Sequence, residues 1–148
     1  MGVLQSLEHL LGDWTGELAT RFMPDDEFVT CSAGASVDVT AGSLVTVRYA
    51  WSNADGPQDG LLLIGDGSAP HEARGIWVDS FHQTPHWMAL QGVASSFEVA
   101  LEGVYAAPPG PDWGWRIRVS GLGDLILTMI NLPSDNAAYE VVRASFSR

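Results

Sequence analysis

The chain has 148 residues, of which 46% are hydrophobic, and a formal net charge of −11 at pH 7. A chain of this length fits one domain and buries roughly two-thirds of its unfolded surface without help from disulfides or metals. Its basic side chains are seven scattered arginines, which argues against binding to nucleic acid or to anionic lipid.

Cysteine usage and hydropathy indicate the compartment. Cys31 is the single cysteine, so we expect neither an intramolecular disulfide nor a cysteine-based zinc site. No segment is apolar enough to span a membrane, and the first residues lack the basic flank and apolar run of a signal peptide. We therefore expect a cytoplasmic protein without a membrane or nucleic-acid partner.

Hydrophobic periodicity changes once along the chain. Apolar residues recur at helical spacing over residues 3–11, and Gly12 follows where a helix end favours glycine. After Gly12 the period becomes two, and turn residues such as Gly, Pro, Asp and Asn separate the apolar runs. The candidate strands are 14–22, 29–40, 44–53, 60–66, 73–82, 86–91, 96–106, 113–121, 124–131 and 137–146.

Short sequential strands joined by tight turns predict an antiparallel meander. Because no long helix is available to cover a sheet, closure into a barrel removes the exposed edges. We therefore predict one all-β domain over residues 1–148, an antiparallel barrel of about ten strands with helix 3–11 packed across one end. Gly16 and Gly103 lie in the predicted inward faces, where they either leave room for a ligand or mark bends or bulges. The sets predicted to face inward are Trp14, Gly16 and Leu18; Val45, Val47, Tyr49 and Trp51; Phe97, Val99, Leu101, Gly103 and Tyr105; and Trp115, Ile117 and Val119.

The strand Gly75–His82 carries polar groups on both faces. Alternation places Trp77 and Asp79 on one face and His82 on the other. The large aromatic residues predict that the Asp79 face is inside, with Arg143 or a Trp or Tyr donor as the partner of the carboxylate. His82 would then lie at the strand end, where it either reaches the barrel rim from the outer face or is turned inward by a bulge.

Two catalytic interpretations of this segment are weak. Asp79, Ser80 and His82 are the residue types of an acyl-transfer triad, but in a regular strand Asp79 points away from the imidazole. His82 and His86 would bind a metal across a hairpin only if a carboxylate such as Asp79 or Glu72 joined them. We predict no catalytic residue, no metal site and no cofactor, with both histidines bonded to loop backbone at the barrel mouth.

Three segments carry a family resemblance. Leu10–Glu17 resembles the Gly-x-Trp-x-Gly signature that opens the barrels of lipocalins, fatty-acid-binding proteins and nitrobindins. Together with Trp77–His82 and a last strand containing Tyr139, Glu140 and Arg143, the chain resembles the bacterial DUF1579 family. The resemblance implies a lipocalin-like barrel of the calycin type, with no established activity.

The related barrels also suggest ligand contacts. Nitrobindins bind haem through a histidine in the C-terminal part of the barrel, whereas the last histidine here is His86, so haem is not expected by that route. In fatty-acid-binding proteins an Arg and a Tyr near the chain end hold a ligand carboxylate, which suggests Arg143 and Tyr139. The internal partner of the guanidinium would otherwise be Glu17 or Asp79.

The predicted function is binding of a small apolar or amphipathic molecule in the barrel cavity. The alternatives are an enzyme that uses Asp79 or His82 as acid or base, and a filled barrel that acts through protein contacts. A homodimer is also expected, because strands such as Leu61–Ile64 and Leu125–Leu127 are apolar on both faces. The candidate ligand-binding residues are Trp14, Glu17, Trp51, Trp77, Asp79, His82, Trp115, Tyr139 and Arg143.

Overall fold

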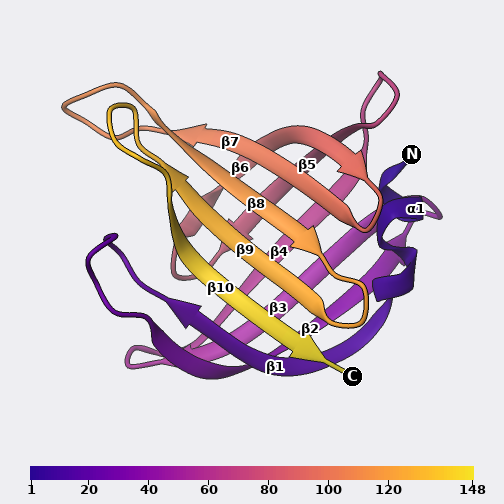
Figure 1. Ribbon diagram of the computed structural model, residues 1–148, viewed down its shortest axis with the longest axis horizontal. Helices are drawn as coiled ribbons and strands as arrows, with labels where there is room; N and C mark the ends of the chain where they lie inside the picture. Colours follow the sequence, from indigo (N-terminus) through magenta and orange to yellow (C-terminus); the bar gives the residue numbers. More distant parts are fainter.

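The computed structural model describes residues 1–148 as a closed antiparallel barrel of ten strands with a short N-terminal helix (Figure 1). Each strand pairs with its neighbours in the sequence, and β1 closes the barrel against β10. The predicted fold class is therefore confirmed. The elements are α1 (Val3–Leu7), a 3₁₀ turn η1 (Glu8–Leu10), β1 (Gly12–Thr20), β2 (Val29–Thr40), β3 (Leu44–Asn53), β4 (Gly56–Asp66), β5 (Glu72–Asp79), β6 (Gln83–Ser95), β7 (Glu98–Tyr105), β8 (Trp113–Ser120), β9 (Leu125–Leu132) and β10 (Tyr139–Ser147).

The helical segment covers one end of the barrel, as the sequence predicts. Val3 and Leu7 are fully buried, and α1 contacts β3, β4, β6 and β7. The backbone N–H of Val3 donates to the Asp66 carboxylate at the end of β4 (2.7 Å). Gly12 then adopts a φ of 122°, which favours glycine and lets the chain turn directly into β1. None of the helical segments combines the length and hydropathy needed to cross a bilayer.

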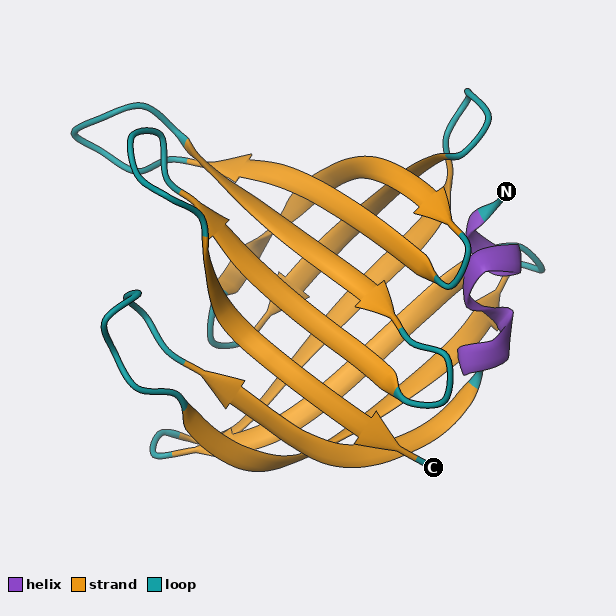
Figure 2. Cartoon of the chain, in the orientation of Figure 1, coloured by secondary structure: helices purple, strands orange, loops and turns teal.

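The opposite end of the barrel carries the long connections, and we call it the loop end. Because the strands alternate in direction, the connections 21–28, 54–55, 80–82, 106–112 and 133–138 gather there, away from α1 (Figure 2). The loop end has no helix across it. A ligand would therefore reach the interior more readily from this side.

Inward-facing side chains form one continuous core of 29 buried hydrophobic residues. The predicted inward alternation holds in β3, where Val45, Val47, Tyr49 and Trp51 are all buried. Phe97 departs from its predicted inward position, because it lies in the β6–β7 turn with a positive φ and is exposed.

The two glycines of the predicted inward faces mark close packing rather than empty space. A Cβ at Gly16 would lie 2.0 Å from the backbone oxygen of Ser145, and one at Gly103 would lie 2.7 Å from the sulfur of Met88. Neither glycine therefore leaves room for a ligand, because neighbouring atoms already occupy the space that a side chain would take.

Two irregularities in the ladder change which side chains face inward. In the β9–β10 pair the register shifts between Glu140 and Val142, so that Val141 and Val142 are both buried. In the β5–β6 pair it shifts between Trp77 and Asp79, where β5 ends three residues earlier than predicted. The bulge in β10 inverts the alternation of the residues that follow it, whereas in β5 the alternation continues through Asp79 and ends with the strand.

Candidate ligand-binding site

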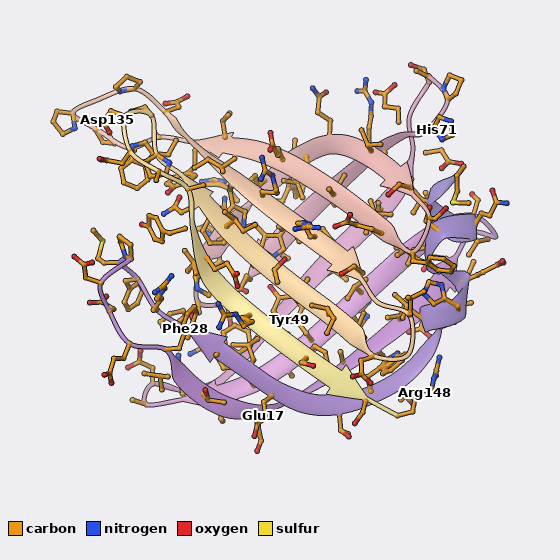
Figure 3. The ribbon with its side chains drawn as sticks, viewed as in Figure 1. Glu17, Phe28, Tyr49, His71, Asp135 and Arg148 are labelled. Carbon is orange, nitrogen blue, oxygen red and sulfur yellow. The ribbon has the colours of Figure 1, made fainter.

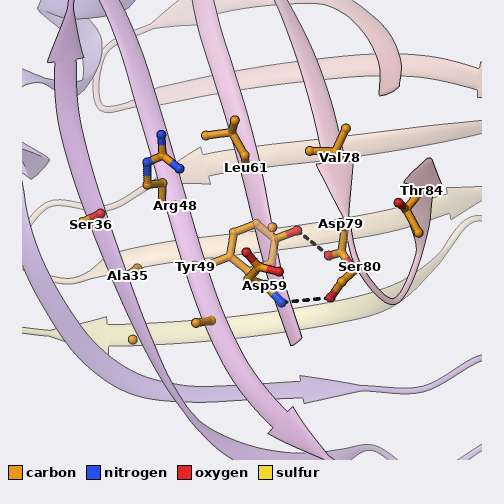
Figure 4. A pocket seen from close by; sticks show the side chains of 13 residues that line it. Ala35, Ser36, Arg48, Tyr49, Asp59, Leu61, Val78, Asp79, Ser80 and Thr84 are labelled. Carbon is orange, nitrogen blue, oxygen red and sulfur yellow. Dashed lines mark hydrogen bonds between the residues drawn. The ribbon is translucent and has the colours of Figure 1, made fainter. Parts of the chain in front are cut away.

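Asp79 is the centre of a buried hydrogen-bond network at the loop end. Its side chain is 1% exposed, which confirms the prediction that Asp79 faces inward. Oδ2 accepts a hydrogen bond from the Tyr49 hydroxyl (2.5 Å), as Figure 4 shows. Oδ1 accepts from the backbone N–H groups of Phe81 (2.8 Å) and His82 (3.0 Å) and lies 3.2 Å from Nδ1 of His82. The predicted Tyr donor is thus present.

Tyr49 reaches Asp79 because β4 carries a glycine between them. Gly60 is paired with Tyr49 on one side and with Asp79 on the other. A Cβ on Gly60 would lie 2.2 Å from Cζ of Tyr49, so only glycine lets the ring cross β4. The Trp77 indole N–H then donates to the Tyr49 hydroxyl (2.9 Å). The result is a relay of hydrogen bonds from Trp77 through Tyr49 to Asp79.

The network keeps Asp79 ionised and Tyr49 protonated. Burial by itself raises the pKa of Asp79, but the hydrogen bonds that the carboxylate accepts from His82, from the Tyr49 hydroxyl and from the backbone of Phe81 outweigh burial and lower the pKa below its ordinary value. Burial, and then the charge of Asp79, raise the pKa of Tyr49 well above its ordinary value. Asp79 therefore acts as an acceptor and Tyr49 as a donor.

His82 lies in the turn after β5, with its ring inside the barrel beside Asp79. The regular-strand expectation, which placed the two side chains on opposite faces, is wrong because the strand ends at Asp79 and the turn redirects the chain. The His82 side chain is only 8% exposed. The prediction that Asp79 cannot orient the imidazole is corrected for the same reason, since Oδ1 now fixes Nδ1.

Aromatic rings surround the imidazole. The His82 ring centroid lies 6.2 Å from that of Trp51, 6.5 Å from that of Trp77 and 6.0 Å from that of Trp115. Trp77 and Trp115 stack on each other at 5.3 Å, and the Phe81 ring meets His82 edge on. These contacts hold the imidazole in an apolar environment.

A pocket of about 230 Å³ opens beside this cluster, and its wall is mainly hydrophobic. Two buried nitrogen atoms of lining residues have no hydrogen-bond partner in the protein: Nε2 of His82 and Nε1 of Trp115. Nε1 of Trp51, which is not a lining residue, is also buried without a partner. Each such group costs about 1–3 kcal/mol when it stays unpaired. The lining residues are Phe22, Trp77, Phe81, His82, Gln83, Met88, Tyr105, Trp115, Asn131 and Val141.

The other polar groups of this pocket are already paired. The Tyr105 hydroxyl donates to Oδ1 of Asn131, and Nδ2 of Asn131 donates to the hydroxyl of Tyr139 (3.0 Å). The Tyr139 hydroxyl in turn donates to the backbone oxygen of Phe22 (3.2 Å), which ties β10 to the β1–β2 loop. This chain of bonds positions the rim of the pocket.

A second hollow of about 460 Å³ borders Tyr49 and Asp79 from the outer face of β2–β5 (Figure 4). Its wall includes the outward-facing Arg48, Asp59 and Ser80. The Ser80 hydroxyl accepts from the backbone N–H of Asp59 (2.9 Å) and donates to Oε1 of Gln58 (2.7 Å). Because no buried polar atom in the wall of this hollow lacks a hydrogen-bond partner, the hollow is a weaker candidate than the aromatic pocket.

Five of the predicted site residues come together at the loop end: Trp51, Trp77, Asp79, His82 and Trp115. Trp14 does not join them, because its indole N–H donates to the Leu10 carbonyl at the α1 end (2.8 Å). Tyr139 lies at the rim, half-buried, and reaches the site only through Asn131.

Glu17 and Arg143 are corrections to the predicted site. Glu17 is exposed on the outer face of β1, where Figure 3 shows it pointing away from the barrel. Arg143 is also on the outside, paired with Glu140 (2.9 Å) and packed against the Phe28 ring. The bulge before Arg143 inverts its face, so it neither partners Asp79 nor reaches the cavity.

Several site residues were not predicted from the sequence as site residues. Tyr49 stood among the inward residues of β3 without a role, although a hydroxyl in a buried alternation was a usable signal. Asn131 follows Leu125, Leu127 and Met129 in the inward alternation of β9, and a polar residue in such a row is also a signal. Nothing in the sequence indicated Phe22, which reaches the pocket from a loop.

The metal alternative finds no support in the geometry. His86 is exposed on β6, whereas His82 is buried in the preceding turn. No group of three or more His, Cys, Asp or Glu side chains is placed to hold a metal ion.

Comparison with known proteins agrees with the barrel. The fold is similar to the crystal structure of Rv2717c from M. tuberculosis, with a TM-score of 0.66, 16% sequence identity, and coverage of 98% of this chain and 96% of that chain. No curated protein matches the sequence. The model of the family described as "Protein of unknown function (DUF1579)" matches residues 4–148. The chain with this lipocalin-like barrel and its buried Asp79–His82 pair therefore belongs to the DUF1579 family.

Proposed function

We propose that this protein binds one small, mainly apolar molecule in the aromatic pocket at the loop end. The single observation that carries the proposal is Nε2 of His82, a buried polar atom without a protein partner on the wall of an otherwise apolar pocket. Small-molecule sites typically combine hydrophobic and aromatic walls with one or two placed polar groups. A ligand that bonds to Nε2 would remove the cost of leaving this atom unpaired.

A second candidate function is catalysis by the same pair. Asp79 orients His82 through Nδ1 at 3.2 Å, and this arrangement prepares Nε2 to take a proton from a bound molecule. No Ser, Thr or Cys lines the aromatic pocket, so the pair would act as a general base without a protein nucleophile. Steady turnover that His82→Ala abolishes would favour the enzyme over the binding protein.

Two measurements test binding. Native mass spectrometry of the purified protein, together with its visible absorption spectrum, would reveal a retained ligand. In addition, the indole N–H signals of the six tryptophans can be followed by NMR during titration with indole and with n-hexanol. We expect the Trp115 signal to shift, while the Trp14 signal at the α1 end stays fixed because its N–H is bonded to Leu10.

A variant that fills the pocket provides the control. Val141→Phe places a larger side chain in the pocket wall, and we expect it to abolish the shift of the Trp115 signal. The exposed His86→Ala should leave the shift unchanged. Equal shifts of the Trp14 and Trp115 signals, or a response that survives Val141→Phe, would contradict binding at this place.

A further inference from the structure

The hydrogen bonds of Asp79 determine which nitrogen of His82 carries the proton. Asp79 is a carboxylate that accepts through both oxygens and has no proton to give. In the neutral imidazole, Nδ1 must therefore be the donor to Oδ1, since the two atoms lie 3.2 Å apart. The lone pair is then on Nε2, which makes this buried atom a hydrogen-bond acceptor on the pocket wall.

A donor lines the same pocket. Nε1–H of Trp115 is buried without a partner, and the Trp115 ring lies 6.0 Å from the His82 ring. An indole N–H only donates, whereas Nε2 of neutral His82 only accepts. One ligand atom satisfies both only if it donates and accepts, and the oxygen of a neutral hydroxyl does both.

Charge argues for a neutral ligand. The pocket is lined by no Arg, and Asp79 holds a negative charge directly behind the His82 ring. The whole chain adds a formal net charge of −11. A carboxylate or phosphate in this pocket would lack a fixed positive partner, and the lone pair of Nε2 would face its oxygen atoms.

Shape and size favour a single aromatic ring. Most of the wall is aromatic, including Trp77, Trp115, Phe81 and Tyr105, and Met88 and Val141 add aliphatic surface. The pocket volume is about 230 Å³. Cavities of about 150 Å³ with apolar walls hold benzene, so this pocket has room for one ring with a small substituent.

We propose that the pocket takes a neutral single-ring phenol, whose hydroxyl donates to Nε2 of His82 and accepts from Nε1–H of Trp115. This inference rests on the binding function proposed above and specifies its ligand class. The remaining polar side chains that line the pocket are Tyr105, Asn131 and Gln83. Tyr105 donates to Asn131 and Nε2 of Gln83 donates to the backbone oxygen of His86, so these groups do not require a second polar group on the ligand.

Calorimetric titration of the full chain with four matched probes tests the class: p-cresol, toluene, 4-methylanisole and p-toluate. All four share a methyl-substituted ring, and only p-cresol both donates and accepts a hydrogen bond. We expect p-cresol to bind at least about tenfold more tightly than toluene or 4-methylanisole, because a site built around hydrogen bonds rejects analogues that lack them. We expect p-toluate to bind most weakly.

Variants at His82 and Trp115 test whether these two residues cause the preference for p-cresol over toluene. His82→Phe keeps a ring but removes the acceptor, so p-cresol should fall to the affinity of toluene while toluene itself is unchanged. The matched control His86→Phe changes an exposed histidine and should leave all four affinities as they are. If His82→Phe fails to fold, Trp115→Phe removes only the donor and should still reduce the preference for p-cresol over toluene.

Each outcome distinguishes the two proposals. Toluene or p-toluate binding as tightly as p-cresol would overturn the phenol class and leave the binding function standing. A preference for p-cresol that persists in both His82→Phe and Trp115→Phe would overturn the role of these residues. No binding of any probe would overturn the phenol class, and the same result with indole and n-hexanol and no retained ligand would overturn the binding function as well.

Discussion

Asp79 connects three parts of the barrel through one carboxylate. It accepts hydrogen bonds from Tyr49 on β3 and from two backbone N–H groups of the turn after β5, and it orients the His82 ring. A buried carboxylate is costly unless such donors surround it, and the donors are equally dependent on the carboxylate. This mutual dependence explains why an acidic residue is tolerated inside an apolar barrel.

Replacing Asp79 by alanine should therefore destabilise the protein strongly. Asp79→Ala leaves the Tyr49 hydroxyl, two backbone N–H groups and Nδ1 of His82 without their acceptor, and we expect a loss of about 3 kcal/mol in the free energy of unfolding. His82→Ala removes only the ring donor and keeps the Tyr49 and backbone donors, so it should cost less, about 1 kcal/mol. Urea denaturation at pH 7 measures both, and equal losses would contradict the central position of Asp79.

The lowered pKa of Asp79 predicts how stability depends on pH. Because the folded state lowers the pKa, the ionised carboxylate stabilises the fold fully above the unfolded pKa, which is about 3.9 for aspartate. This contribution is lost as the pH falls through the lower folded value. Asp79→Asn carries no such group, so its stability should fall less steeply below about pH 4 than that of the wild type. Parallel curves of unfolding free energy against pH would show that Asp79 is not linked to folding.

At the scale of elements, β4 determines whether a side chain of β3 can form a hydrogen bond with a side chain of β5. Gly60 lies between Tyr49 and Asp79 in the ladder, and its missing side chain leaves the space that the Tyr49 ring occupies. A strand with any other residue at this position would separate the two partners, because a Cβ there lies 2.2 Å from the Tyr49 ring.

Gly60→Ala should consequently displace Tyr49 and weaken the fold by about 2 kcal/mol, a typical cost of overpacking. Gly123→Ala is the control, since a Cβ at Gly123 meets nothing within 4 Å, and it should change stability by less than about 0.5 kcal/mol. Thermal unfolding by circular dichroism gives both values. A neutral Gly60→Ala would mean that Tyr49 has another route to Asp79.

At the scale of the whole molecule, the two barrel ends have different roles. α1 covers one end and contributes Val3 and Leu7 to the core, while the loop end presents the pocket. The outer surface retains apolar side chains, with Leu61, Leu63 and Ile126 only half-buried and Trp87, Val93 and Val104 exposed on β6 and β7. A closed barrel buries one face of each strand, so apolar outer residues need another cover.

We propose homodimerisation as that cover. Sedimentation at micromolar concentration should give a mass of twice 15.9 kDa. The dimer fraction should rise with protein concentration by mass action and should resist added salt, because the surface that drives association is apolar. Sedimentation as a monomer across the micromolar range would contradict this prediction.

The sequence by itself determined the barrel and much of its interior. Alternation with period two, regular turn residues and the single helical segment predict ten antiparallel strands and a capping helix, because local side-chain patterns encode which face is buried. The same alternation predicts that Trp51, Trp77, Asp79 and Trp115 are inside. Trp51, Trp77 and Trp115 lie in regularly paired stretches, and Asp79 keeps its regular pairing with β4 although the β5–β6 register shifts just before it.

Only the tertiary structure decided how these residues meet. The early end of β5 brings His82 onto Asp79, the bulge in β10 sends Arg143 outward, and Gly60 lets Tyr49 cross a strand. Bulges and strand ends depend on pairing between segments distant in sequence, and one such shift inverts every following side chain. Alternation therefore predicts which face a side chain occupies only as far as the next irregularity, and in this chain His82 of the candidate site follows such an irregularity directly.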